Sequence, residues 1–477
     1  MTGPGGRLLD TARGAYVRSP DWVRALLRPG LMLVPTSLKF GNTYRQWRRD
    51  IARAADDPAF ARERQLLAFR RLLAKAHAGS PFYRDIIDKA FGPGFDAQAV
   101  RIEDVRRLPI LTKGVLEAAG PAALAVPRVL VDRAETSGSN AETPFRFYLD
   151  KDRSAREMAF VYDAWARVGY TESTARATLR GFGFGRASEK THEWDPVLRE
   201  LRLATFPLTE ADAALYLDLI ERRRIRFLYG YPSSVELFCR QLERLGRRPR
   251  LPFRGIMLVS EPLYEHQRQL IAKTLGEVPI SCFYGMSEKA IFGAEMPGQP
   301  GVYHSNPLYC LAELVDAQGE PVTEPGGEGR LIGTGFLSTG MPFIRYDSGD
   351  FARLVEAPSP GNGQRLVVAA LASRRKPDFL VMRDGGRMVT MDLTSEDPDH
   401  YRGIAEFQFY QDQPGKVRFR YVLAPDGTDG DAQRVVEALH RRCRGRLDFE
   451  LEAVSRIATG RNGKRAFIDQ RLDFSLY

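Results

Sequence analysis

Three short runs decide the fold of this chain: IRFLYGY at residues 225–231, GIMLVS at 255–260 and PISCFYG at 279–285. Each is rich in β-branched and aromatic residues and is bounded by turn-forming residues, which predicts a buried strand. Apolar residues recur at helical spacing at 211–223, before the first run, at 234–245, between the first and second runs, and at 264–275, between the second and third. Short strands that alternate with helices of about 10–15 residues predict a parallel α/β sheet.

Toward the N-terminus, the pattern is helical first and mixed later. Apolar residues recur at helical spacing from 47 to 91, and the proline of SPFY at 80–83 is expected to end a helix. Residues 129–149 predict a strand, a Ser/Gly-rich loop and a second strand. A helix is expected over 154–168, and TARATLRGFGFG at 174–185 predicts a strand that enters a glycine-rich turn.

Toward the C-terminus, the sequence pattern changes twice. After residue 298, short segments broken by Gly and Pro predict a small β-barrel or sandwich. A domain boundary is expected near 371–378. Beyond it, a strand, a strand pair and a helix predict a small α+β domain of about 100 residues.

The composition excludes several classes of protein. Of 477 residues, 43% are hydrophobic and 27% charged, which is typical of a soluble globular chain and not of a disordered, collagen-like or disulfide-stapled one. The four cysteines form no CxxC pair, which predicts reduced thiols in a cytoplasmic protein. No run of 18 apolar residues and no signal-peptide core occurs, so neither membrane spanning nor export is expected.

The charge balance is mildly basic, at +10. Nucleic-acid binding is disfavoured, because the arginines are spread along the chain and no recognition motif is present. The first 53 residues carry ten basic side chains among Trp and Leu. These predict either a helix that docks on an anionic membrane or, more simply, a solvated basic face packed on the main body.

Two of the four segments that carry chemistry contain serine and glycine near predicted strand ends. TSGSN at 136–140 can cradle phosphate oxygens with hydroxyl and N–H groups, although alone it fits an ordinary turn as well. YGMSE at 284–288 ends a predicted strand, where α/β sheets place ligands. There Tyr284 can stack on a base, Ser287 can contact a phosphate, and Glu288 is an oxygen ligand suited to Mg²⁺ or a plain surface carboxylate.

The other two segments lie further along the chain. RYDSGD at 345–350 places Asp350 after a Ser-Gly turn, where it can accept both hydroxyls of a ribose or serve as an ordinary turn residue. GRNGK at 460–464 places Lys464 in a loop flanked by glycine. Only eleven of the 70 basic residues are lysines, so an ammonium group there indicates a need for a compact charge, unless its placement is chance.

In this order, the four segments resemble those of the adenylate-forming superfamily, and the resemblance runs from about residue 70 to about residue 470. The resemblance is strongest to the phenylacetate–coenzyme A ligase branch and its CapK-like relatives. Supporting matches are SPFY at 80–83, LPILTK at 108–113, YGYPSS at 229–234 and MPF at 341–343.

The resemblance implies an α/β fold with two domains. A large N-terminal adenylation domain, residues 1–373, would hold mainly parallel sheets flanked by helices, with a helical lead-in over about 1–100 and a small β-barrel over about 300–370. A mobile α+β lid domain, residues 374–477, would follow.

The resemblance also implies a reaction. Relatives use ATP to activate a carboxylic acid as an acyl-adenylate, releasing pyrophosphate, and pass the acyl group to an acceptor, here first of all coenzyme A. The alternatives are an amide or ester ligase, an AMP transferase, and a degenerate homologue that binds nucleotide without turnover. The acid is not identified, although aromatic residues favour an aryl acid slightly, and a homodimer is left open.

The residue roles follow from the same resemblance. Lys464 would bridge the substrate carboxylate and the α-phosphate, and Glu288 would hold Mg²⁺. ATP or AMP would contact Ser137, Gly138, Ser139, Glu261, Pro262, Tyr284, Gly285, Ser287, Asp350 and Arg375. The acid would lie near Tyr229, Tyr231, Pro232 and Ser233.

Three departures from the family pattern stand out. The phosphate loop continues as 140–143 and is one residue longer than usual, which implies a different grip on the phosphates. Ser260 replaces the usual glycine on the adenine side and is expected to crowd the base. The hinge segment 373–378 lacks a glycine before its arginines; Arg375 keeps the family spacing, and Pro377 would stiffen the rotation between half-reactions.

Overall fold

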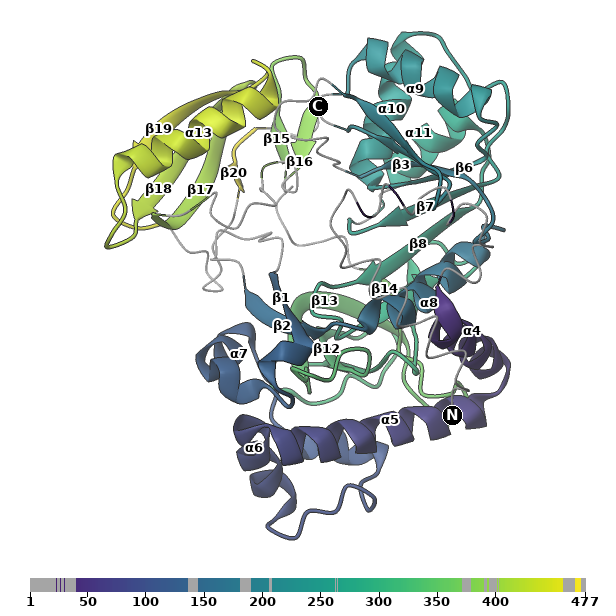
Figure 1. Ribbon diagram of the computed structural model, residues 1–477, viewed down its shortest axis with the longest axis vertical. Helices are drawn as coiled ribbons and strands as arrows, with labels where there is room; N and C mark the ends of the chain where they lie inside the picture. The colour runs from purple at the N-terminus through teal and green to yellow at the C-terminus, as the bar shows by residue number, and fades with distance from the viewer. Residues whose placement is uncertain are drawn as a thin grey trace.

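A computed structural model of the chain describes most of its residues (Figure 1). These are 40–135, 145–180, 190–205, 208–261, 265–370, 379–389, 403–457 and 468–472, with the single residues 23, 26, 30, 263, 393 and 401. In this part of the chain, no helix is both long enough and apolar enough to span a membrane.

The parallel α/β sheet predicted from the three short runs is confirmed. Its parallel strands are β3 (Arg176–Leu179), β5 (Glu200–Leu203), β6 (Phe227–Gly230), β7 (Gly255–Val259) and β8 (Ile280–Gly285), in the order β8-β7-β6-β3-β5. β4 (His192–Asp195) closes this edge antiparallel to β5. Every residue of β7 is buried, as expected for a central strand covered on both faces.

Helices connect and cover these strands (Figure 1). They are α8 (Arg153–Ala166), α9 (Glu210–Arg222), α10 (Pro232–Arg244) and α11 (Glu265–Leu275). α9 begins with a capping box, in which Thr209 and Asp212 bond each other's backbone N–H groups. α10 begins with Pro232 at its first position, where the missing N–H costs nothing. α8 is fastened to the sheet by a hydrogen bond from Ser281 Oγ to the Ala164 carbonyl (2.8 Å).

The β-rich segment is not a sheet of its own. Its strands are β9 (Phe292–Glu295), β10 (Val302–Ser305), β11 (Cys310–Val315), β12 (Glu328–Gly335), β13 (Tyr346–Glu356) and β14 (Val367–Ala370). They continue the parallel sheet as an antiparallel extension in the order β11-β12-β13-β14-β10-β9-β8, because β9 pairs with both β8 and β10. The separate barrel or sandwich expected here is thus replaced by one twelve-stranded sheet.

The N-terminal lead-in is helical, as predicted: α4 (Gly41–Asp56), α5 (Pro58–Gly79) and α6 (Pro81–Phe91). Pro81 does not merely end a helix, since Ser80 closes α5 and also caps α6 through its Oγ and the Tyr83 N–H (3.2 Å). The Tyr83 hydroxyl donates to the Pro342 carbonyl (2.5 Å). This bond joins two of the family-like segments, SPFY and MPF.

Short elements follow the lead-in and end in a hairpin. They are η1 (Ile102–Arg107), α7 (Lys113–Ala119), η2 (Gly120–Ala123), η3 (Arg128–Leu130), β1 (Val131–Glu135) and β2 (Arg146–Asp150). β1 and β2 pair antiparallel, so the two predicted strands are confirmed. The Ser/Gly-rich loop between them lies outside the described residues.

The C-terminal residues have a hydrophobic core of their own. The elements are β15 (Phe379–Val381), β16 (Arg387–Val389), β17 (Ile404–Gln413), β18 (Lys416–Leu423), α13 (Asp429–Cys443), β19 (Asp448–Ala453) and β20 (Ile468–Gln470). Buried side chains from Leu380 to Ile468 form one cluster, and those from Phe40 to Val368 form another. The domain division at 373/374 stays a prediction, because 371–378 are not described.

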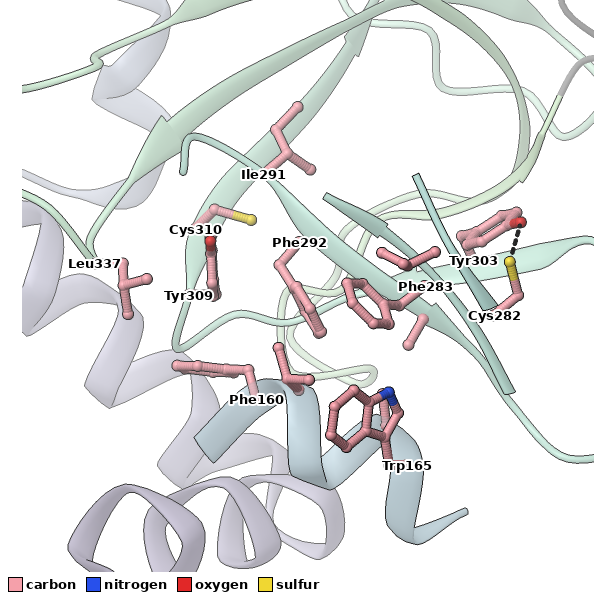
Figure 2. Close-up of a cluster of buried hydrophobic side chains, with 14 of the residues drawn as sticks. Phe160, Trp165, Cys282, Phe283, Ile291, Phe292, Tyr303, Tyr309, Cys310 and Leu337 are labelled. Carbon is pink, nitrogen blue, oxygen red and sulfur yellow. Dashed lines mark hydrogen bonds between the residues drawn. The ribbon is translucent and has the colours of Figure 1, made fainter. Parts of the chain in front are cut away.

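The larger core is packed with aromatic side chains. Figure 2 shows Phe160 and Trp165 of α8 pointing at the sheet, where Phe160 meets Tyr309 with ring centroids 5.0 Å apart. The Tyr303 hydroxyl lies 3.4 Å from Cys282 Sγ. Aromatic pairs at such distances contribute about 0.5–1.5 kcal/mol each beyond their buried area.

All four cysteines are buried, and none of them forms a disulfide. Burial raises the pKa of Cys282 and of Cys310 to about 12, so neither is a thiolate at neutral pH. We expect no cysteine of the native protein to react with an aromatic disulfide reagent within minutes, and all four to react after denaturation. Rapid labelling of a native thiol would contradict this burial.

Candidate active site

Two of the predicted motifs meet across the sheet. Tyr284 stands next to last in β8, and its hydroxyl donates a hydrogen bond to Asp350 Oδ2 of β13 (2.7 Å). Tyr346 opens β13, and its hydroxyl donates to Glu288 Oε1 (3.0 Å), just beyond β8. YGMSE and RYDSGD therefore hold each other through two reciprocal hydrogen bonds, each from a tyrosine to a carboxylate.

A bulge in β13 aims Asp350 at this contact. Asp347 pairs with Ile332 and Phe351 pairs with Arg330, so four steps along β13 match only two along β12. Gly349 takes up the bend with φ +73°, a conformation that disfavours side chains. The Asp350 N–H donates to Ser348 Oγ (3.1 Å). Such bulges re-aim side chains next to functional sites.

Glu288 is the buried carboxylate of the site, with 6% of its surface exposed. Burial raises its pKa, which the hydrogen bond from Tyr346 only partly offsets. The neighbouring ammonium of Lys289 forms an ion pair with Glu157 of α8. Among the described residues, no Arg or Lys forms an ion pair with Glu288, and no three His, Cys, Asp or Glu side chains cluster as metal ligands.

Two further predicted residues meet at the start of α10. Ser233 donates from its backbone N–H to Glu261 Oε2 and from its Oγ to Glu261 Oε1, both at 3.0 Å. A carboxylate at this position also interacts favourably with the positive end of the helix dipole. Glu261 follows β7 and Ser233 follows β6, so both lie at the carboxyl edge of the parallel strands.

The predicted substrate residues Tyr229 and Tyr231 are buried beside two arginines. Tyr229 packs edge-on against Trp165, with centroids 4.8 Å apart. Arg180, directly after β3, donates from Nη1 to the Tyr229 hydroxyl (2.6 Å). The guanidinium carbon of Arg176 lies 5.8 Å from the ring centre of Tyr229, and Arg176 forms a buried ion pair with Glu200 (3.0 Å).

Three residues with strained backbones adjoin the motifs. Ser260, Lys289 and Arg345 have φ values of 71°, 62° and 46°, in the left-handed region. Arg345 is held by two bonds to Glu313 (3.0 and 3.1 Å) and one to the Leu108 carbonyl (2.7 Å). Strain of this kind persists where the surroundings enforce it and concentrates at functional sites.

The strain at Ser260 leads to a stability prediction. A left-handed L-residue costs about 1–2 kcal/mol, whereas glycine adopts this conformation freely. Because glycine also gains entropy in the unfolded chain, we expect Ser260→Gly to raise the free energy of unfolding by up to about 1 kcal/mol. Arg224→Gly, at φ 52° in the exposed turn after α9, is the matched control and should change in the same direction. Urea titration measures both, and a less stable Ser260→Gly would contradict the assigned strain.

Several predicted residues lie outside the described part of the chain: Ser137, Gly138, Ser139, Pro262, Arg375 and Lys464. Gly285 and Ser287 are exposed at the end of β8, and Pro232 is buried at the start of α10. The sequence motifs pointed to no role for Arg180 or for Tyr346. The arginine in the glycine-rich turn 180–185 was the available signal for the first, and the RYDSGD motif for the second.

Comparisons with known proteins show what the chain is similar to. No protein-family model matches the chain. It is 21% identical to CapK of Staphylococcus aureus over 397 residues, 81% of this chain and 84% of CapK. It is 27% identical to the phenylacetate-coenzyme A ligase of Thermus thermophilus over 329 residues, 66% of this chain and 70% of that ligase.

A solved structure matches the fold. This is a 2-hydroxyisobutyryl-CoA ligase in complex with 2-HIB-AMP and CoA, with TM-score 0.55 and 16% identity over 86% of this chain and 90% of that one. The mixed α/β architecture expected from the sequence is therefore confirmed.

Proposed function

We propose that this chain, which is similar to CapK and to phenylacetate–coenzyme A ligases, is a divergent member of the adenylate-forming superfamily and activates a carboxylic acid with ATP. The products of this step are an acyl-adenylate and pyrophosphate. The acyl group then passes to a thiol, first of all that of coenzyme A. The observation that carries the proposal is the pair of hydrogen bonds that joins the segment of Glu288 to the distant segment of Asp350.

The first step would depend on orientation and charge. A carboxylate is a weak nucleophile toward an anionic phosphate, so the reaction needs positioning and charge neutralisation above all. Asp350, oriented by Tyr284, would accept the ribose hydroxyls, and Tyr284 would cover the adenine. Gly285 and Ser287 would face the phosphates, with Ser137, Gly138 and Ser139 binding the departing pyrophosphate.

Glu261 and Ser233 would shape the space between nucleotide and acid. Their two hydrogen bonds lock Glu261 to the start of α10. Tyr229, Tyr231 and Pro232 would contact the acid beyond them. Arg375 would complete the ribose site, and Lys464 would bridge the acid and the α-phosphate.

The residues fit a magnesium ion held mainly by its nucleotide. Glu288 is a buried carboxylate without an ion-pair partner in the described part, which suits a cation ligand. Mg²⁺ usually takes one or two carboxylates together with substrate phosphates and water, so the lack of a larger acidic cluster among these residues agrees with this role. When bound, the ion would neutralise phosphate charge.

The proposal extends to domain motion, cellular location and assembly. The lid domain 374–477 would rotate between the two half-reactions and bring the acceptor to the adenylate. The reduced, buried cysteines support a cytoplasmic protein. The basic N-terminal segment would pack on the body or touch an anionic membrane, and a homodimer would match the habit of relatives.

The deciding experiment is ATP–pyrophosphate exchange with Mg²⁺ and no acceptor, against aryl, fatty, hydroxy and amino acids. Exchange with one class establishes adenylation and identifies the acid, after which coenzyme A and amines are compared as acceptors. ATP binding without any exchange would contradict the proposed enzyme. It would favour the degenerate nucleotide-binding homologue, which the longer loop 140–143 supports.

A further inference from the structure

We propose that Arg180 binds a second anionic group on the substrate acid, so that the protein selects dicarboxylic over monocarboxylic acids. The inference rests on the proposed function, because it names the substrate class of the same site. It starts from a guanidinium that the fold places at the carboxyl edge of the parallel strands, where sheets of this kind bind ligands.

The side chain of Arg180 is held in a defined position. Its Nη1 donates to the Tyr229 hydroxyl at 2.6 Å. Its guanidinium carbon lies 5.1 Å from the ring centre of Tyr229 and 5.2 Å from that of Tyr231. Both tyrosines are predicted substrate residues, so the cation lies against the space proposed for the acid. A planar fork positioned in this way is suited to a carboxylate.

The described residues give Arg180 no ion-pair partner, although Glu200 attracts its charge from a greater distance. No Asp or Glu of this part forms an ion pair with it, whereas Glu200 accepts from Arg176 (3.0 Å), Thr178 (2.7 Å) and Arg202 (3.2 Å). Burial raises the pKa of Tyr229, which therefore stays a neutral phenol. Arg180 Nε is buried without a hydrogen-bond partner. A half-buried cation with an unused donor costs free energy that an incoming anion would offset.

The order of strands sets the length of the acid. The reactive carboxylate would lie beside Glu288 at the end of β8, and Tyr229, which Arg180 contacts, is two strands away on β6. Neighbouring strands are about 4.8 Å apart, so the two ends of the acid would be roughly 10 Å apart. An extended dicarboxylic acid of medium chain length meets this requirement.

The test compares octanoic acid with octanedioic acid in pyrophosphate exchange. We expect the wild type to prefer the diacid in kcat/KM, and Arg180→Met to lower that preference by roughly 10- to 100-fold, the loss of one hydrogen-bonded charge pair. Arg180→Lys should recover part of it, because lysine keeps the charge but not the fork. Arg222→Met, an exposed arginine on α9, should match the wild type. A purely structural role would lower both rates and leave their ratio unchanged.

Each other outcome separates this inference from the proposed function. Equal use of both acids by the wild type, or an unchanged ratio in Arg180→Met, would overturn the inference and leave the function standing. If Arg180→Met raises the KM for coenzyme A but not for pantetheine, which lacks the phosphate groups, then Arg180 binds the acceptor and not the acid. This result would also overturn the inference. If no acid supports exchange, calorimetry with octanedioate decides. Binding to the wild type that is lost in Arg180→Met supports the inference without the proposed function. No binding of octanedioate to the wild type overturns both the inference and the proposed function.

Discussion

Glu288→Gln lowers the rate of ATP–pyrophosphate exchange by about 10²- to 10³-fold, the usual effect of removing one electrostatic contact to the reacting phosphates. Glutamine keeps the shape of the side chain and still accepts the hydrogen bond from Tyr346. Only the negative charge is lost. The expected result therefore separates the proposed role of that charge in holding Mg²⁺ from the role of the side chain in packing.

Two further measurements test this prediction: thermal unfolding of the variant, and exchange by a matched control variant. Because burial raises the pKa of Glu288, the ionised carboxylate costs stability at neutral pH, and the variant should unfold at the same or a higher temperature. Glu328→Gln, an exposed glutamate on β12, serves as the control and should leave exchange unchanged. Exchange within about threefold of the wild type in Glu288→Gln would show that the carboxylate contributes no charge of the kind assigned to it.

Lys464→Ala is expected to slow adenylation by about 10²- to 10³-fold as well. The physical reason is the loss of an ammonium between two anions, the substrate carboxylate and the α-phosphate, which otherwise repel each other as they approach. ATP binding should change much less than the exchange rate, because this contact is strongest in the transition state. Nucleotide binding and exchange are therefore measured on the same preparation.

Lys416→Ala supplies the matched control. After the predicted hinge the chain has only these two lysines, and Lys416 is exposed at the start of β18. A general effect of removing positive charge from the C-terminal domain would appear in both variants, whereas the assigned role appears only in Lys464→Ala. Pyrophosphate exchange that is unchanged in Lys464→Ala would remove this residue from the mechanism.

The sheet illustrates which structural features sequence patterns can predict. The runs at 225–231, 255–260 and 279–285 became β6, β7 and β8 because apolar strands between amphipathic helices have few other ways to bury their side chains. The strands after residue 298 were recognised as strands but not as part of the same sheet. Their place in the sheet depends on β9 turning back along β8 and on β10 pairing with β14, where Val302 lies opposite Ala369, and no local pattern records that second, long-range contact.

The site divides in the same way. The sequence by itself determined the candidates for nucleotide binding, because Tyr284, Glu288 and Asp350 stand in motifs whose order is informative. The tertiary structure alone decided that the Tyr284 hydroxyl meets Asp350 and that Tyr346 meets Glu288. It also decided that Arg180 lies against Tyr229 without a carboxylate partner among the described residues. Hydrogen bonds and charge balance depend on distances of a few ångströms between segments far apart in the chain, and only folding sets those distances.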